Sequence, residues 1–272
     1  MSTLWDRMLL VPSVIRLASR APKNPDAAWE GYWRGIRTTG RSGDVLWDSD
    51  SLAERAQYSG AVLAHFDPAL PVVDVGCGNG THTRWLASLF PRVLGIDVSK
   101  GAVEMASREA EGIPNADFIV LDAAGAGAGD LLLDRLGPAN VFVRGVFHVL
   151  KPDRQAAVAA NLRTVIGNRG RVLLAETNFR GNSLGYLAGL GATRQSMPLQ
   201  VQRALENLPR PGHFGAKERR SVFSDLEWQV IADGPVDIEV VPLNASGLSQ
   251  WVPGYYALLS GAEDSGTGHE RV

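Results

Sequence analysis

Cysteine is almost absent from the sequence, which has only Cys77 among its 272 residues. A disulfide needs two cysteines and a cysteine-cluster zinc site needs several, so neither can form within this chain. One thiol is compatible with a reducing compartment. We interpret Cys77 as a small residue that fills a loop, because no evident base lies beside it to activate it as a nucleophile.

The sequence also lacks an excess of charge of one sign. Its 27 lysine and arginine residues are balanced by 29 aspartate and glutamate residues, which gives a formal net charge of −2 at pH 7. Proteins that bind nucleic acid use a basic excess to neutralise phosphates. The balance therefore argues against a nucleic-acid partner and favours a small molecule.

Long hydrophobic runs are missing as well. No uninterrupted apolar stretch approaches the ~20 residues that a membrane-spanning helix requires. The most apolar N-terminal stretch, MLLVPSVIRLASR, is interrupted by Pro12 and Arg16, and no clear small-residue cleavage site follows it. We therefore expect a soluble, cytoplasmic protein with no membrane partner.

From residue 71 onward, short apolar runs alternate with helical stretches. PVVDVG, RVLGIDV, ADFIVLDA, ANVFVRG and GRVLLAET read as buried strands, and VDIEVVPL and GYYALLSG as two closing strands. Strands that are apolar on both faces and separated by helices are typical of a parallel sheet covered on both sides. The pattern predicts an α/β fold: a Rossmann-like, doubly wound, mostly parallel sheet of seven strands, the last one antiparallel.

Three segments lie outside this alternation. Residues 1–60 are rich in tryptophan and should form an N-terminal helical segment that either adds to the core or covers a ligand. Residues 179–225 form an insertion far longer than usual connections, and we expect a substrate cap there. The catalytic domain should cover residues 61–260, and the small, polar residues 261–272 should be disordered.

The first apolar run leads into a glycine-rich loop in VVDVGCGNG, with Gly76, Gly78 and Gly80 at alternate positions and Asp74 two residues before them. The loop ends a strand and opens a helix at the carboxyl edge of a parallel sheet, where such folds bind ligands. Without Cβ atoms, these glycines can adopt positive φ and let a ligand approach the backbone. The loop indicates a nucleotide-like ligand.

Two further acidic residues follow the next strands. Asp97 ends RVLGID, where a carboxylate can accept both ribose hydroxyl protons of an adenosine. Asp122 lies in FIVLDA, where its side chain can accept from an adenine amino group and the amide of Ala123 can donate to a ring nitrogen. Structural alternatives stay open: Asp74 as a strand-end hydrogen-bonding residue, Asp97 as a helix N-cap and Asp122 as a turn former.

This combination of motifs resembles the class I S-adenosylmethionine-dependent methyltransferases: VVDVGCGNG looks like their first motif, GIDVS their second, LDA their third and VFVRGVFHVL their fourth. The resemblance covers residues 71–177. It implies S-adenosyl-L-methionine as the cofactor, with Asp74 and the glycine loop at its methionine end and Asp97 at the ribose. It further implies Asp122 at the adenine and the backbone near Arg144 on the sulfonium side.

The chain departs from the family pattern in two places. Asn140 stands where many members have an acid, and the N/D-P-P-Y box of amino-adenine DNA methylation is missing. DNA methylation of that type is therefore disfavoured. A catechol-type metal site needs clustered acids, and Asp122 and Glu176 alone do not establish one, so we expect no metal.

A methyl acceptor that must lose a proton needs a base, and the sequence offers three candidates. His148 follows the fourth strand beside the expected position of the methyl group, Glu176 ends the fifth strand, and His213 lies in RPGHFG. A packed histidine in the FHVL turn is the alternative for His148.

The insertion gives the main hint about the acceptor. Residues 179–225 carry seven basic and three acidic residues, which suits either a solvated surface or an anionic acceptor. The aromatic N-terminal segment suits a flat or apolar acceptor. We therefore predict methyl transfer to oxygen, nitrogen or carbon of a small molecule, a specialised metabolite.

Two other functions stay open at the level of the sequence. A nicotinamide-dependent oxidoreductase shares the role of Asp97 but favours G-x-G-x-x-G and leaves Asp122 unexplained. A protein that binds the cofactor and acts on its substrate without methyl transfer would not produce S-adenosylhomocysteine. The oligomeric state also stays open between a monomer and a homodimer.

Overall fold

The structure is a computed structural model that describes residues 11–48, 52–181, 186–187, 190, 192, 197–241 and 250–262. The tail expected at residues 261–272 lies outside the described residues beyond Ala262, and so do parts of the 1–60 and 179–225 segments. In the described part of the chain, no helix has the length and apolar character that a membrane crossing requires.

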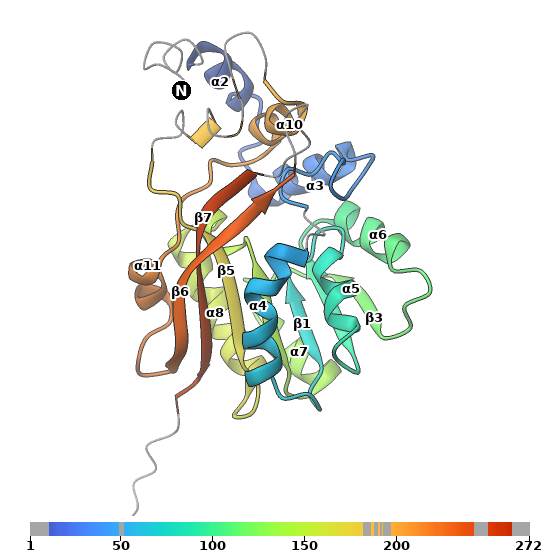
Figure 1. Cartoon of the computed structure of the whole chain (residues 1–272), viewed down its shortest axis with the longest axis vertical. Coiled ribbons are helices and arrows are strands. Elements are labelled where there is room, and N and C mark those ends of the chain that lie inside the picture. Colours follow the sequence, from blue (N-terminus) through green and yellow to red (C-terminus); the bar gives the residue numbers. More distant parts are fainter. Residues whose placement is uncertain are drawn as a thin grey trace, which may run out of the picture.

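A seven-stranded sheet forms the centre of the described chain, in the order β3-β2-β1-β4-β5-β7-β6 (Figure 1). Strands β1 to β5 pair in parallel, while β7 runs antiparallel to both β5 and β6. This confirms the predicted Rossmann-like, mostly parallel sheet with its antiparallel last strand. The strands are β1 (Val72–Val75), β2 (Val93–Asp97), β3 (Ala116–Val120), β4 (Asn140–Arg144), β5 (Val172–Thr177), β6 (Trp228–Val240) and β7 (Gln250–Gly261).

The two closing strands are longer than the sequence predicts. β6 begins at Trp228, whereas the apolar pattern indicated a strand only from Val236, because Gly234 and Pro235 are residues typical of turns. β6 is the edge strand of the sheet and pairs only with β7, so the missing N–H of a proline costs no ladder hydrogen bond there. Pro235 is therefore accommodated inside the strand, opposite Tyr255.

Helices cover both faces of the sheet. Helices α4 and α5 lie on one face, and α7, α8 and α11 lie on the other (Figure 1). Neighbouring residues of β1 alternate between the two cores, since Val72 packs with the first and Val73 with the second. The core helices are α4 (Leu52–His65), α5 (Thr81–Ala87), α6 (Lys100–Glu109), α7 (Ala128–Leu136), α8 (Pro152–Ile166) and α11 (Ala216–Val222).

A further group of helices lies near the carboxyl ends of the parallel strands: α2 (Val11–Ala18), α3 (Pro25–Gly35) and α10 (Leu199–Asn207) (Figure 1). Helix α3 starts at an Asn24 cap that accepts from the amide of Ala27. Helix α10 contacts both α2 and α3, and α3 contacts α6. The N-terminal segment and the insertion thus come together at the sheet edge where such folds bind ligands.

Helix α4 crosses the boundary expected at residue 60. Its Tyr58 and Val62 are buried in the core with β1 and β4, and α4 also contacts β6. The part of the N-terminal segment that lies over the sheet edge therefore ends before α4.

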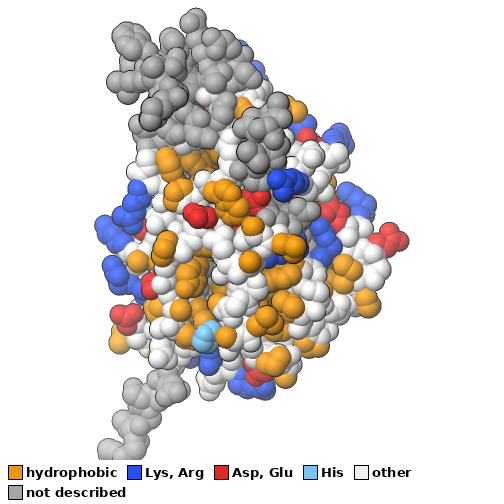
Figure 2. All heavy atoms as spheres, viewed as in Figure 1, with side chains coloured by type: hydrophobic (Ala, Val, Ile, Leu, Met, Phe, Trp, Pro, Cys, Tyr) orange, Lys and Arg blue, Asp and Glu red, His pale blue; other side chains and the backbone are white. Residues whose placement is uncertain are grey.

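On the face shown in Figure 2, no continuous basic surface is visible. Lysine and arginine side chains are spread around the rim of that face, with acidic side chains among them. This distribution agrees with the nearly balanced charge of the sequence.

Candidate active site

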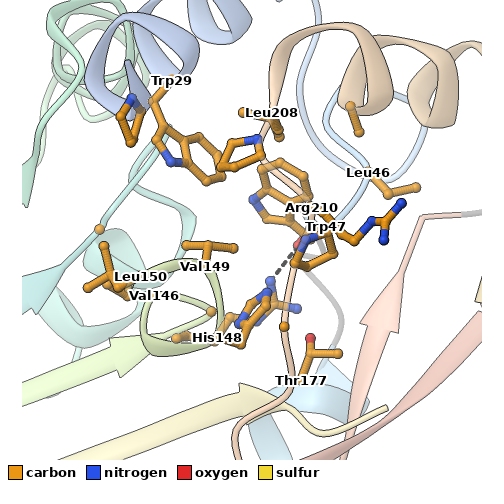
Figure 3. Close-up of a pocket in the computed structure, with 18 of the residues that line it drawn as sticks. Trp29, Leu46, Trp47, Val146, His148, Val149, Leu150, Thr177, Leu208 and Arg210 are labelled. Atoms are coloured by element: carbon orange, nitrogen blue, oxygen red, sulfur yellow. Dashed lines mark hydrogen bonds between the residues drawn. The ribbon is translucent and has the colours of Figure 1, made fainter. Parts of the chain in front are cut away.

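A cavity of about 900 Å³ lies between the carboxyl ends of β1 to β5 and the helices α2, α3 and α10 (Figure 3). This volume is near the upper end of the ~300–1,000 Å³ usual for ligand pockets, so it can hold a cofactor and a second small molecule. Each of these strands lines the cavity at or just beyond its end, with Val75 and Gly76, Asp97 and Val98, Leu121 and Asp122, Arg144 and Gly145, and Ala175 and Thr177.

The glycine loop between β1 and α5 has the backbone that the sequence predicts. Gly76, Gly78 and Gly80 have φ angles of 69°, 55° and 76°, which residues with a Cβ rarely adopt. Gly76 lines the cavity, whereas Gly78 and Gly80 do not. A Cβ atom at Gly78 would lie 2.7 Å from Cζ2 of Trp33, so this glycine makes room for an indole of α3.

Asp74 is buried behind the loop and does not line the cavity. Its carboxylate accepts a 2.5 Å hydrogen bond from Oγ1 of Thr83, in the first turn of α5. Burial raises the pKa of Asp74 to about 7, and the neighbouring carboxylate of Asp97 adds to the rise. This position favours a structural role, in which Asp74 ties α5 to β1, over the predicted contact with the methionine end of the cofactor.

Asp97 lines the cavity at the end of β2, with 8% of its surface exposed. Its two carboxylate oxygens accept from the amide of Gly78 at 3.0 Å and from the amide of Ser99 at 2.9 Å. Each carboxylate oxygen has a further lone pair, so the group can still accept from the two hydroxyls of a ribose. Burial raises the pKa of Asp97 to about 6, against the lowering effect of those amides.

Asp122 and Ala123 line the cavity just after β3. Oδ1 of Asp122 accepts from the amide of Ala124 at 3.0 Å and forms a 2.6 Å ion pair with Arg154 of α8. No described residue donates to Oδ2. Arg154 also lines the cavity, and no sequence motif indicated it because it lies on another element, 32 residues away.

The residues at this end of the cavity fit an adenosyl group. The carboxylates of Asp97 and Asp122 and the bare backbone at Gly76 meet on one cavity, as the sequence predicts. Carboxylate oxygens accept from hydroxyl and amino groups, and flat apolar walls pack against an aromatic ring. The apolar side chains lining this end include Val98, Leu121 and Leu150.

Arg144 lines the cavity, but its guanidinium is committed to a buried network. Nε and Nη2 each donate to the carboxylate of Glu54 in α4 at 2.9 Å, and Nη1 donates to the carbonyl of Trp47 at 2.9 Å. Glu54 also accepts from the hydroxyl of Tyr58 and, at 2.8 Å, from the amide of Glu239. Burial alone lowers the pKa of Arg144, but Glu54 and Tyr58 raise it overall. The network joins α4, β4 and β6 on one side of the cavity.

His148 and Glu176, which the sequence offers as separate candidate bases, are in direct contact. Nδ1 of His148 lies 2.7 Å from Oε2 of Glu176. The imidazole lines the cavity, whereas the Glu176 side chain is 0% exposed and does not. Because an ionised carboxylate only accepts, the proton of a neutral imidazole resides on Nδ1 and Nε2 keeps its lone pair.

The carboxylate of Glu176 also orders the turn that carries His148. It accepts from three successive backbone amides around η1 (Phe147–Val149): Val146 and Phe147 at 2.9 Å and His148 at 3.1 Å. Its oxygens are thus occupied within the protein. This geometry favours His148, rather than Glu176, as the group that meets an acceptor.

His213, the third candidate base, lies at a more open part of the cavity. Its side chain is 46% exposed, and its Nε2 lies 3.3 Å from Oε1 of Glu218. A base works best where water is excluded from the reacting groups. The structure therefore favours the enclosed His148 over His213.

The insertion lines the cavity through α10, through residues 208–213 and, closer to β5, through residues that include Leu187 and Leu190. The amide of Gly212 donates to the carbonyl of His148 at 2.7 Å, and the amide of Phe214 donates to Thr177 at 3.0 Å. These bonds hold residues 208–213 over the turn of η1. The sequence indicated an insertion here, but not that it would touch His148.

The basic residues of the insertion have different surroundings. Arg203 pairs with Asp44 at 2.5 Å and Arg219 with Asp233 at 3.4 Å, while Arg194 lies outside the described residues. Arg210 lines the cavity and has no ion-pair partner among the residues that the structure describes.

The N-terminal segment lies over the glycine loop. Glu30 of α3 accepts from Oγ of Ser99 at 2.8 Å and from the amide of Gly101 at 3.0 Å, where α6 begins. Burial raises the pKa of Glu30, but these bonds and Arg34 lower it to about 2 overall. Trp29 and Trp33 of the same helix line the cavity. Only the aromatic content of the segment hinted at this arrangement.

A second contact fixes the loop that follows α3. Asp48 accepts from the side-chain amide of Asn79 at 2.8 Å and from Oγ1 of Thr81 at 2.7 Å. Asp48 is 4% exposed, and no local motif marked it as a partner of the glycine loop.

The surroundings of Cys77 make its thiol unreactive. Cys77 is buried, and burial raises the pKa of its thiol well above the usual range, with Asp97 and Asp74 adding to the rise. A thiol in that state is a poor nucleophile.

In the part of the chain that is described, no three His, Cys, Asp or Glu side chains gather into a group that could hold a metal ion.

Comparisons with known proteins agree with this geometry. A family model described as a methyltransferase domain matches residues 72–170. Methyltransferase nsrG from Aspergillus novofumigatus is 28% identical over 76% of each chain. Demethylmenaquinone methyltransferase from Symbiobacterium thermophilum is 25% identical, over 65% of this chain and 77% of that protein.

One solved structure resembles the chain over more of its length. The crystal structure of a SAM-dependent methyltransferase from Anabaena variabilis is 27% identical in sequence and has a TM-score of 0.73. The match covers 89% of this chain and 98% of that one. The alignment therefore extends beyond the sheet and its covering helices.

Proposed function

Because the chain belongs to the class I S-adenosylmethionine-dependent methyltransferases, we propose that it methylates a small molecule, a specialised metabolite, with His148 as the general base. The enzyme class and the cofactor, S-adenosyl-L-methionine, follow from the family. The role of His148 as a base toward a small-molecule acceptor is supported by one observation: His148, oriented by Glu176, lines the same cavity as Asp97.

In this proposal the cofactor lies along the carboxyl ends of β1 to β4. Asp97 accepts from the ribose hydroxyls, Oδ2 of Asp122 accepts from the adenine amino group, and the amide of Ala123 donates to the ring. The backbone of Gly76 and that near Arg144 face the methionine and sulfonium portion. Asp74, Gly78 and Gly80 do not line the cavity. We therefore propose that they hold the loop in its conformation, rather than contact the cofactor as the motif alone implies.

S-adenosylmethionine supplies a methyl group attached to a sulfonium. Transfer is an in-line displacement, so the protein mainly aligns the reacting atoms and excludes water. The new bond joins the acceptor atom to the methyl carbon, the methyl–sulfur bond breaks, and its electron pair stays on sulfur. An acceptor that carries a proton passes it to Nε2 of His148.

Several features support a small-molecule acceptor. The cavity lies between the strand ends and three helices, α2, α3 and α10, and most of its lining beyond the cofactor end is apolar. A concave, mostly apolar cavity of this size suits a small ligand rather than a duplex or a protein surface. The Symbiobacterium relative is named for demethylmenaquinone, which is also a small molecule.

The same geometry supports a cap formed by the N-terminal segment before α4 and by the insertion up to residue 213, over a catalytic domain that ends at residue 260. The bounds of 1–60 and 179–225 were too wide, because α4 and α11 pack against the sheet instead. Glu30 and Trp33 contact the glycine loop and the start of α6, while α10 contacts both α2 and α3. Caps of this kind exclude water from a transfer reaction.

The first test is Asp97→Ala, which should weaken the affinity for S-adenosylhomocysteine at least about tenfold, because a hydrogen bond to a charged group is worth ~1.5–3 kcal/mol. The affinity should also fall as the pH drops through about 6, the raised pKa of Asp97, since only the carboxylate can accept from both hydroxyls. Isothermal titration calorimetry between pH 5 and 8 measures both effects.

The exposed Asp134→Ala serves as the matched control and should bind like the wild type. Unchanged affinity in a folded Asp97→Ala protein would refute the ribose assignment.

The second test concerns the cap. Adding S-adenosylhomocysteine should slow amide hydrogen exchange in residues 25–36 as well as in the glycine loop, because Glu30 and Trp33 contact residues next to the cofactor end. In Glu30→Gln the slowing in residues 25–36 should shrink, while Glu111→Gln, at an exposed position, should behave like the wild type. Protection confined to residues 74–123 would contradict the cap.

A further inference from the structure

The cavity has an apolar arm on the side away from Asp97 and Asp122. It is built by the loop after α3, by the insertion and α10, and by β6 and β7. Its lining includes the buried side chains Leu46, Leu190, Val201, Ile238 and Val252. Such a wall binds an apolar body through the hydrophobic effect, and offers few hydrogen bonds to a sugar or a peptide backbone.

Beside this arm, Arg210 is a cationic side chain that lines the cavity and has no ion-pair partner among the described residues. Among the described residues, Arg144 is bound to Glu54 and Arg154 to Asp122, whereas Arg210 is exposed and has no ion-pair partner. Lys151 also lines the cavity, but it lies three residues before Arg154 and so belongs to the adenine end. A guanidinium without a partner beside an apolar wall is suited to a carboxylate.

A backbone contact places the segment that carries Arg210 beside the turn that carries the proposed base. The amide of Gly212 donates to the carbonyl of His148 at 2.7 Å. Arg210 precedes Gly212 by two residues, which together span at most about 7 Å. Figure 3 shows His148, Trp47 and Arg210 around the same space. One small molecule can therefore meet both His148 and Arg210.

We propose that the methyl acceptor is an apolar small molecule that carries a carboxylate, with the carboxylate on Arg210, the apolar body against the apolar arm and the methylated group at His148. This rests on the proposed function and narrows its substrate class. A neutral apolar acceptor would leave Arg210 as a solvated surface cation.

Two probes that differ only in the charged group test this assignment: decanoate and 1-decanol, titrated in the presence of saturating S-adenosylhomocysteine. Binding is read from the intrinsic fluorescence of tryptophan, because Trp29 and Trp47 line the cavity. Decanoate should bind the wild type about three- to tenfold more tightly than 1-decanol, the range expected for a partly exposed carboxylate–guanidinium pair. Arg210→Gln should remove this preference and leave 1-decanol binding unchanged.

The matched control is Arg220→Gln, an exposed arginine of α11 that does not line the cavity and should keep the preference for decanoate. Equal affinities of the two probes in the wild type, or an unchanged preference in Arg210→Gln, would overturn the proposal. Calorimetry with S-adenosylhomocysteine on the same preparations separates this result from a failure of the proposed function, since cofactor binding does not involve Arg210.

Discussion

Replacing His148 with glutamine should lower the rate of methyl transfer about 10²- to 10⁴-fold, the usual contribution of a general base. The affinity for S-adenosylhomocysteine should stay unchanged, because the imidazole is proposed to meet the acceptor rather than the cofactor. The rate is measured as acceptor-dependent release of S-adenosylhomocysteine. The acceptor for this assay comes from screening the protein and labelled cofactor against the products of neighbouring genes.

Glu176→Gln tests how the imidazole is held. A glutamine amide can donate to Nδ1 of His148, which shifts the ring proton to Nε2 and removes the lone pair that would accept the proton. The turnover should therefore fall although the imidazole is still present. The variant should also melt at a lower temperature, because a glutamine side chain offers one acceptor oxygen where the two oxygens of Glu176 bind three backbone amides.

The pH dependence of turnover separates a base from a packed histidine. A histidine base contributes an ionisation to the pH profile of the rate, and His148→Gln, which has no imidazole, should lose it. A merely structural histidine would instead lower the melting temperature and leave the turnover of the folded fraction normal. His65→Gln, at an exposed position on α4, is the control and should match the wild type.

Two other results would change the assignment. Near-native turnover in His148→Gln together with a large loss in Glu176→Gln would transfer the role of base to Glu176. Near-native turnover in both would mean that alignment of the reactants alone accounts for the rate, since proximity can supply more than a base does. His213→Gln, at the open part of the cavity, completes the set of candidates.

Features that follow from local patterns could be predicted from the sequence. Buried parallel strands are apolar on both faces, so β1, β2, β4 and β5 are visible as short apolar runs separated by helices. The sequence also indicated β3 as a buried strand, but it is the partly exposed edge strand of the sheet. The carboxyl ends of parallel strands meet at one edge of the sheet, so the sequence alone could place Gly76, Asp97 and Asp122 on one cavity. The position of Pro235 inside a strand could not be predicted, because a proline is tolerated there only when the strand is at the edge of the sheet, as β6 is.

Features that depend on contacts between distant segments could not be predicted. The contact between His148 and Glu176 joins residues 28 positions apart, and no local pattern separates it from two independent candidates. Gly78 fits the motif of a ligand loop, yet its missing Cβ makes room for Trp33, which lies on a helix outside the motif. Arg144 belongs to a motif of the family as well, but its partner Glu54 lies 90 residues earlier.

We expect the largest effect on stability from breaking the ion pair between Arg144 and Glu54. The side chains of Arg144 and Glu54 are 6% and 0% exposed, and two hydrogen bonds of 2.9 Å join them. Breaking a buried pair by removing one partner costs about 3–5 kcal/mol, because it leaves an uncompensated charge in a place that water cannot reach. Glu54→Leu and Arg144→Met should each lower the free energy of unfolding by that amount.

Urea denaturation and thermal melting measure the loss, which corresponds to roughly 6–20 °C in melting temperature for a domain of this size. The double variant Glu54→Leu/Arg144→Met should be less destabilised than the sum of the single variants, because it leaves neither charge unpaired. Lys100→Met, which breaks the exposed pair with Glu104 at 3.5 Å, should change the stability by less than about 1 kcal/mol. Additive losses in the double variant would show that the two side chains act separately, and the network would then not be the link between α4, β4 and β6.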